Sequence, residues 1–225
     1  MQFNSFDLSI IPPLIYLAAF LFGLFACYRK TCPLYFRLLL FGVGCFLLEE
    51  IYYLTDYICI GSWSDSFSFA CFGSGGCYAF MLSANYGLMD GIVDDGCSNS
   101  QTARRIGKIA PLILLLIFII CSVYSYKSDG RLFPIVLMLI SKFTAFPASY
   151  FQLKHLVLKD NIDYILSYLK PCNALALAVI FLDFISDASY TFGYLPGIAV
   201  TEYLIPLSLL GLMIAADRGI KQWMI

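Results

Sequence analysis

Charged residues are scarce in this sequence. They make up 13% of the 225 residues, whereas 60% are hydrophobic and the mean hydropathy is +0.81. Soluble domains carry about 25% charged residues, so this composition excludes an ordinary soluble domain and predicts an integral membrane protein whose main partner is the lipid bilayer. The formal net charge of −1 offers no basic surface, and nucleic acid is therefore not expected as a partner.

Basic residues are missing from the leader, residues 1–7, which carries Asp7 instead. A signal peptide starts with positive charge, so the first hydrophobic run is expected to stay in the protein as a helix. Histidine occurs once, at His155, in a run that we expect to be a basic cytoplasmic loop. A site with several histidine ligands is excluded, and we expect no metal and no cofactor.

Cysteine is frequent, with nine residues, but the CxxC spacing of redox and metal motifs is absent. Most of the cysteines fall in or beside apolar runs, where we interpret them as small packing residues: Cys27, Cys45, Cys77, Cys121 and Cys172. Cys59 and Cys71 are expected at the outer ends of neighbouring helices. Whether these two form a disulfide stays open.

Long hydrophobic runs dominate the chain, and a spanning helix needs about 20 apolar residues. The sequence therefore predicts an all-α, polytopic membrane bundle, with residues 1–225 as a single transmembrane domain. The seven predicted helices cover approximately residues 8–28, 36–58, 67–89, 109–126, 132–153, 168–191 and 197–216.

Lysine and arginine gather at one set of helix ends, which holds eleven of them, whereas the opposite set holds only Lys127 and Arg131. Basic residues near helix ends stay on the cytoplasmic side. With seven helices, this bias predicts an external N-terminus and a cytoplasmic C-terminus, in the plasma or inner membrane of a cell. The connection over residues 90–105 is predicted to be the longest cytoplasmic loop.

Two of the predicted helices differ from the others in composition. Residues 109–126 contain no polar group deep in the span, which predicts a peripheral helix or a linker helix. Residues 67–89 carry small side chains every four positions, a pattern that lets membrane helices approach closely. We expect this ridge to be buried against another helix; it consists of Cys71, Gly75, Ala79, Ser83 and Gly87.

Residues 132–153 hold Ser141, Lys142 and Thr144 near their centre, with Pro147 close behind. Proline removes one backbone hydrogen bond, so the helix is expected to kink there. An ammonium group at this depth cannot reach the membrane surface and must be paired, deprotonated or hydrated. We predict that Lys142 pairs with an acid of similar depth, with Asp183 or Glu49 as the best candidates.

Acidic residues interrupt three of the hydrophobic runs. Glu49 and Glu50 are adjacent, so they point about 100° apart and are expected to face different neighbours. The spacing from Glu49 to Asp56 predicts one inward stripe, which consists of Glu49, Tyr52, Tyr53 and Asp56.

The later acids lie in the last two predicted helices. Asp183 and Asp187 share a face, with Tyr190 nearby. Glu202 lies four residues before Pro206, whose missing N–H leaves the Glu202 carbonyl without its helical donor. A free carbonyl beside a carboxylate suits a cation or a bound water.

The estimated depths place these acids and Lys142 in one layer between mid-membrane and the outer face. The acids cannot all be ionised at low dielectric without a cation or water. The candidate ligand- or ion-binding residues are Glu49, Glu50, Tyr53, Asp56, Lys142, Asp183, Asp187, Tyr190 and Glu202. No catalytic residue is assigned.

Three functions fit this pattern. An outward-facing acidic cavity could bind or transport a small cation or cationic solute, with proton exchange, and this interpretation is favoured over an enzyme. The alternatives are a seven-helix receptor or sensor that signals through a membrane or cytoplasmic protein partner, and an intramembrane hydrolase that uses two carboxylates on a lipid-like substrate. Retinal binding is excluded because residues 197–216 contain no lysine.

Overall fold

The computed structural model describes residues 10–29, 32–60, 69–90, 99–158 and 163–223. All regular elements within these ranges are helical. They are α2 (Ile11–Arg29), α3 (Leu34–Ile60), the 3-10 turn η1 (Phe69–Cys71), α4 (Phe72–Leu82), the π-helix η2 (Ser83–Asp90), α6 (Ser100–Gly107), α7 (Ile109–Asp129), α8 (Phe133–Lys142), α9 (Ala145–Val157), α10 (Asp163–Thr191) and α11 (Leu195–Trp223).

The prediction of an all-α fold is confirmed over the described residues. Each predicted hydrophobic helix coincides with a helix or with consecutive helical pieces. Five stretches are long and apolar enough to cross a membrane, and they lie in α2, α6 with α7, α8 with α9, α10 and α11. The protein is therefore a helical bundle with membrane-spanning character.

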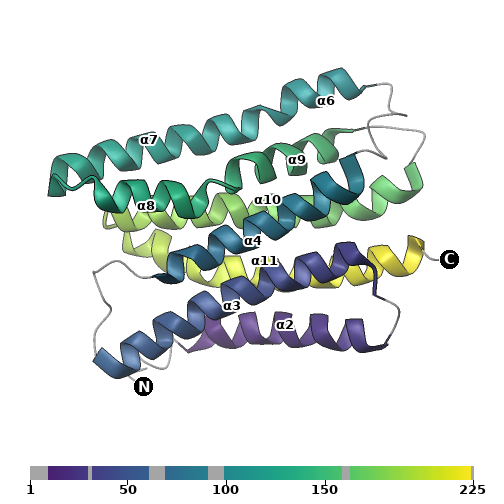
Figure 1. The fold of residues 1–225 in the computed structure, drawn as a ribbon, viewed down its shortest axis with the longest axis horizontal. Helices are drawn as coiled ribbons and strands as arrows, with labels where there is room; N and C mark the ends of the chain where they lie inside the picture. The colour runs from purple at the N-terminus through teal and green to yellow at the C-terminus, as the bar shows by residue number, and fades with distance from the viewer. Residues whose placement is uncertain (1–9, 30–31, 61–68, 91–98, 159–162, 224–225) are drawn as a thin grey trace.

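The helices lie side by side along the long axis of the molecule, with α7 at one edge and α2 at the opposite edge (Figure 1). Helix α10 packs along α11 and α9, and α3 packs along α4 and α2. The buried core runs between these helices and includes Phe36, Phe46, Met81, Phe184 and Met213. Helix α7 exposes a broad apolar face, with Leu112, Leu116 and Val123 on it, so the prediction of a peripheral helix is confirmed.

The prediction of a loop over residues 90–105 is wrong for its last part, because residues 100–107 form α6. This segment contains Ala103 and the helix formers Arg104 and Arg105. Its small residues, Ala103 and Gly107, are buried, and α6 packs on α9. The packing of these small residues explains why residues 100–107 form a helix, which their polar composition did not indicate.

The small-residue ridge of α4 is buried only in part. Gly75 is buried and faces the carbonyl group of Ser141, and the Thr144 hydroxyl donates a 2.9 Å hydrogen bond to the Gly75 carbonyl. Ser83 is exposed, so the prediction that the whole ridge is buried is wrong at this position. The burial of Gly87 lies outside the described part of the chain. At Gly75, α4 therefore lies close to the α8–α9 segment.

The segment that contains Pro147 is not a continuous helix. Helix α8 ends at Lys142 and α9 begins at Ala145. The proline ring of Pro147 excludes the hydrogen bond to the carbonyl four residues earlier, at Phe143, which is where the helix is interrupted. The predicted distortion is confirmed, and it places Lys142 at the C-terminal end of a half-helix.

The described cysteines are all free thiols, so the structure holds no disulfide between Cys59 and Cys71. The sulfur atoms of Cys27 and Cys32 lie 2.8 Å apart. The two thiols face each other where α2 leads into α3. Cys32 lies between the first two predicted helices, and the sequence did not indicate its contact with Cys27.

Candidate functional site

Lys142 is buried, with 5% of its surface exposed, and forms ion pairs with two aspartates of α10. Its Nζ lies 2.7 Å from Asp183 Oδ2 and also contacts Asp187 Oδ2. The two carboxylates are one helical turn apart, so a single ammonium group reaches both. The predicted pairing of Lys142 with Asp183 is confirmed, and Glu49 is not its ion-pair partner.

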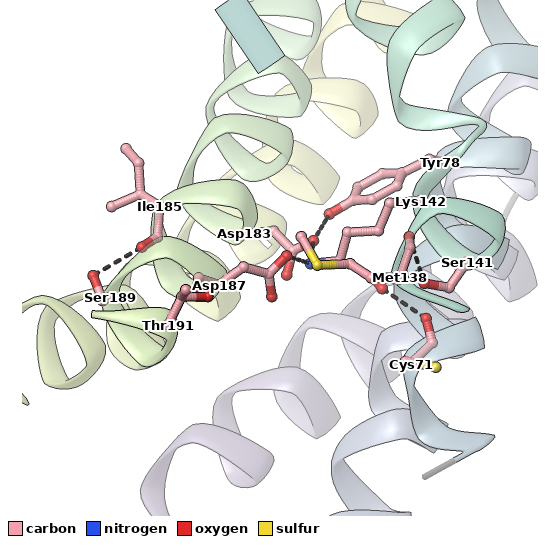
Figure 2. A network of polar contacts seen from close by, with 11 residues as sticks. Cys71, Tyr78, Met138, Ser141, Lys142, Asp183, Ile185, Asp187, Ser189 and Thr191 are labelled. Carbon is pink, nitrogen blue, oxygen red and sulfur yellow. Dashed lines mark hydrogen bonds and ion pairs between the residues drawn. The ribbon is translucent and has the colours of Figure 1, made fainter. Parts of the chain in front are cut away.

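Tyr78 of α4 completes this group, because its hydroxyl donates a 2.5 Å hydrogen bond to Asp183 Oδ2. Figure 2 shows Tyr78, Lys142 and the two aspartates pointing toward one another. Sequence reasoning missed Tyr78. Its position three residues after Gly75 could have indicated its role, because this spacing puts Tyr78 on the face of α4 that approaches Lys142. We call Tyr78, Lys142, Asp183 and Asp187 the lysine cluster.

Glu49 lies beside the lysine cluster, close enough to interact electrostatically with Asp183 and Lys142. Its carboxylate accepts a hydrogen bond from the backbone N–H of Ser74 near the start of α4. Gly73 permits this approach, since a Cβ atom there would lie 2.6 Å from Glu49 Cβ. Glu49 Oε2 is buried and has no hydrogen-bond partner, which marks it as an available acceptor.

Glu50 faces another part of the bundle, as predicted, and its charge interacts with that of Glu202 on α11. The Tyr190 hydroxyl donates a 3.1 Å hydrogen bond to Glu202 Oε1, and both of these side chains are exposed. We call Glu50 and Glu202 the glutamate pair. The candidate residues therefore divide into two groups. Glu49 of α3 lies beside the lysine cluster, and Tyr190 of α10 lies beside the glutamate pair.

The predicted stripe on α3 is correct for Glu49 and Tyr53 but wrong for Tyr52. Tyr53 is half-buried and interacts electrostatically with Glu49 and Lys142, whereas Tyr52 is 44% exposed. Tyr52 lies about 60° from Glu49 around the helix, on the opposite side of Glu49 from Tyr53. Asp56 is half-buried, and it makes no ion pair within the described part of the chain.

The charges of this layer do not balance. Five carboxylates stand against one lysine, and Lys142 is engaged by the two aspartates. In the described residues, no lysine or arginine forms an ion pair with Glu49, Glu50 or Glu202. Carboxylates in such a medium require a counter-cation, a proton or water. The arrangement can therefore take up positive charge.

A further polar group, which the sequence analysis missed, lies buried toward the other end of the bundle. His155 Nδ1 is 3.3 Å from Asn85 Oδ1, and Gln152 and Asn173 are also buried. The prediction that His155 lies in a basic loop is wrong, because it is 1% exposed and sits within α9. The only available signal was its spacing three residues after Gln152, which puts both on one helix face.

Comparison with models of known families, with curated proteins and with solved structures finds no match for this chain.

Proposed function

We propose that this protein binds a small cationic solute at intramembrane carboxylates and carries it across the membrane in exchange for protons. The observation that carries the proposal is the charge imbalance between the five carboxylates and Lys142. Glu49 contributes a buried carboxylate oxygen without a hydrogen-bond partner. The glutamate pair adds a more accessible acidic group, with Tyr190 beside it as an aromatic wall that favours cations.

The interrupted α8–α9 helix supports transport rather than static binding. Transporters place their solute sites at discontinuous helices near the middle of the bilayer, because unwound backbone is tolerated where it lines a polar path. Here the interruption directly follows Lys142. A shift of α8 relative to α10 would break the ion pairs of Lys142 and expose Asp183 and Asp187 to a solute.

The topology that belongs to this proposal has seven membrane passes. Besides the five apolar stretches, α3 and the run from α4 to η2 would cross, and the chain reverses direction between successive passes (Figure 1). The basic residues then lie at the cytoplasmic ends. Reporter fusions should place the N-terminus outside and the C-terminus inside. Reporters that place both ends on the same side would exclude an odd number of passes.

The binding site is tested by isosteric removal of its charge. Glu49→Gln and Glu50→Gln should each weaken binding of ethylammonium to the protein in nanodiscs at least tenfold, because each removes a carboxylate without a basic partner. Tenfold corresponds to about 1.4 kcal/mol. Calorimetric titration measures this, with Thr55→Val on the exposed part of α3 as the matched control. Unchanged affinity in both glutamine variants would contradict the proposal.

A second candidate function is an intramembrane hydrolase, which one observation favours. The unpartnered Glu49 Oε2 is suited to act as general base, and the lysine cluster beside it offers a cation and the Tyr78 hydroxyl to stabilise developing negative charge. A lipid-like ester or ether would reach the site from the bilayer. Product release from a fluorescent lysophospholipid, abolished by Glu49→Gln in a protein that does not bind ethylammonium, would select this function.

A further inference from the structure

Three carboxamide side chains in the second polar group lack hydrogen-bond partners for a buried atom. Asn85 comes from η2, Gln152 from α9 and Asn173 from α10, and each is at most 2% exposed. The unpartnered atoms are Asn85 Nδ2, Gln152 Oε1 and Asn173 Oδ1. Folded proteins rarely leave buried polar atoms unpaired. Three of them in one region offer two acceptors and one donor to a polar ligand.

The packing of α9 on α10 brings these side chains to one level. The Phe146 and Phe184 rings are 5.9 Å apart, which fixes the register of the two antiparallel helices. At about 1.5 Å per residue, Asn173 then lies within about a turn of the level of His155. Gln152 is on the same face of α9 as His155, and Asn85 contacts His155 directly. We call Asn85, Gln152 and Asn173 the amide site.

The hydrogen-bonding atoms of the amide site restrict the chemistry of its ligand. Two oxygens, Gln152 Oε1 and Asn173 Oδ1, need donors, while Asn85 Nδ2 needs an acceptor. A metal ion or a quaternary ammonium cannot satisfy the Asn85 donor, and a simple alkylammonium has no acceptor for it. A protonated amino alcohol supplies both, because its ammonium and hydroxyl groups donate and its hydroxyl oxygen accepts.

The same solute fits the acidic layer, since its ammonium group is a cation for the carboxylates there. Lys142 and Gln152 are ten residues apart along the α8–α9 segment, as are Asp183 and Asn173 along α10, which separates the two sites by about 15 Å. A small solute cannot reach both at once. The helix faces between them carry small, fully buried side chains, namely Ala84, Ala145, Ala148, Ser149 and Ala176.

We propose that the amide site is a second binding site for a protonated amino alcohol, which receives the solute from the acidic layer. This inference rests on the proposed cation transport and narrows its substrate class. The acidic layer holds the charged group, whereas the amide site selects for the hydroxyl group. The neutral amides bind the cation more weakly than carboxylates do. Weaker binding at the second site allows the solute to be released.

The experiment compares ethanolamine with ethylammonium, which lacks only the hydroxyl group. The full-length protein is reconstituted in proteoliposomes, and uptake of each radiolabelled amine is measured. The wild-type protein should take up ethanolamine at least tenfold faster. Gln152→Met and Asn173→Leu should each remove this preference and leave ethylammonium binding unchanged. Gln101→Met, on the exposed surface of α6, is the matched control and should keep the preference.

The outcomes separate this inference from the proposed function. If the wild-type protein binds and carries both amines equally well, cation transport stands and the amide site is not a second binding site for the amino alcohol. Variants that keep the full preference for ethanolamine would also overturn the inference. If the wild-type protein binds neither amine, the proposed function fails and the inference fails with it. Gel filtration establishes that each variant is folded, and Asn85→Leu replaces any variant that is not.

Discussion

Lys142→Met is expected to destabilise the folded protein by about 3–5 kcal/mol, because it leaves the Asp183 and Asp187 carboxylates without their cation. Lys142 Nζ lies 2.7 Å from Asp183 and contacts Asp187 as well, and the lysine is almost fully buried. A methionine fills nearly the same volume, so the loss reflects charge rather than packing. Thermal or denaturant unfolding in detergent micelles measures the change.

Neutralising Asp183 and Asp187 tests whether their unpaired charge causes the loss of stability in Lys142→Met. The triple variant with Lys142→Met, Asp183→Asn and Asp187→Asn should regain most of the lost stability, since neutral groups are tolerated where unpaired charges are not. Tyr78 can still donate its hydrogen bond to an asparagine oxygen at position 183. Lys127→Met, on the exposed surface of α7, is the control and should change stability little. Failure of the triple variant to recover would refute the charge argument.

The pairing of Lys142 with Asp183 could be predicted from two simple quantities, although they also favoured Glu49, which is not a partner, and did not indicate Asp187, which is one. Depth along a helix follows from the rise per residue, and a buried ammonium group requires a partner at its own depth. The helix interruption could also be predicted, because Pro147 always removes the hydrogen bond to the carbonyl four residues earlier, at Phe143. Both predictions follow from local geometry and electrostatics, and neither needs knowledge of which helices are neighbours.

The residues that were missed depend on helix neighbours. Tyr78 and Tyr52 both lie within hydrophobic runs, yet Tyr78 faces the lysine cluster and Tyr52 is exposed. Only the rotation of each helix in the bundle separates them. His155 stood between Lys154 and Lys159, where positive charge indicated a loop, but α9 continues past it and buries it beside Asn85. Hydropathy does not reveal a polar contact between two buried helices.

Gly75→Ala is expected to lower the free energy of unfolding by about 3 kcal/mol, the upper end of the usual cost of overpacking. A Cβ atom at this position would overlap the Ser141 carbonyl oxygen, and backbone cannot rotate aside as a side chain does. Relief requires α4 and α8 to separate. That movement would strain the 2.9 Å hydrogen bond from Thr144 to the Gly75 carbonyl and displace Lys142, the neighbour of Ser141.

Gly211→Ala provides the matched control, because a Cβ atom there would lie 3.5 Å from the nearest Leu175 side-chain atom, an ordinary contact distance. Alanine is also a better helix former than glycine by about 1 kcal/mol, so this variant should be neutral or slightly more stable. Comparing the two variants therefore separates the general effect of replacing glycine by alanine from the steric overlap of position 75 with the Ser141 carbonyl. Equal stability of the two variants would show that α4 does not approach Ser141 through Gly75, and it would remove the contact that positions Lys142 beside Asp183.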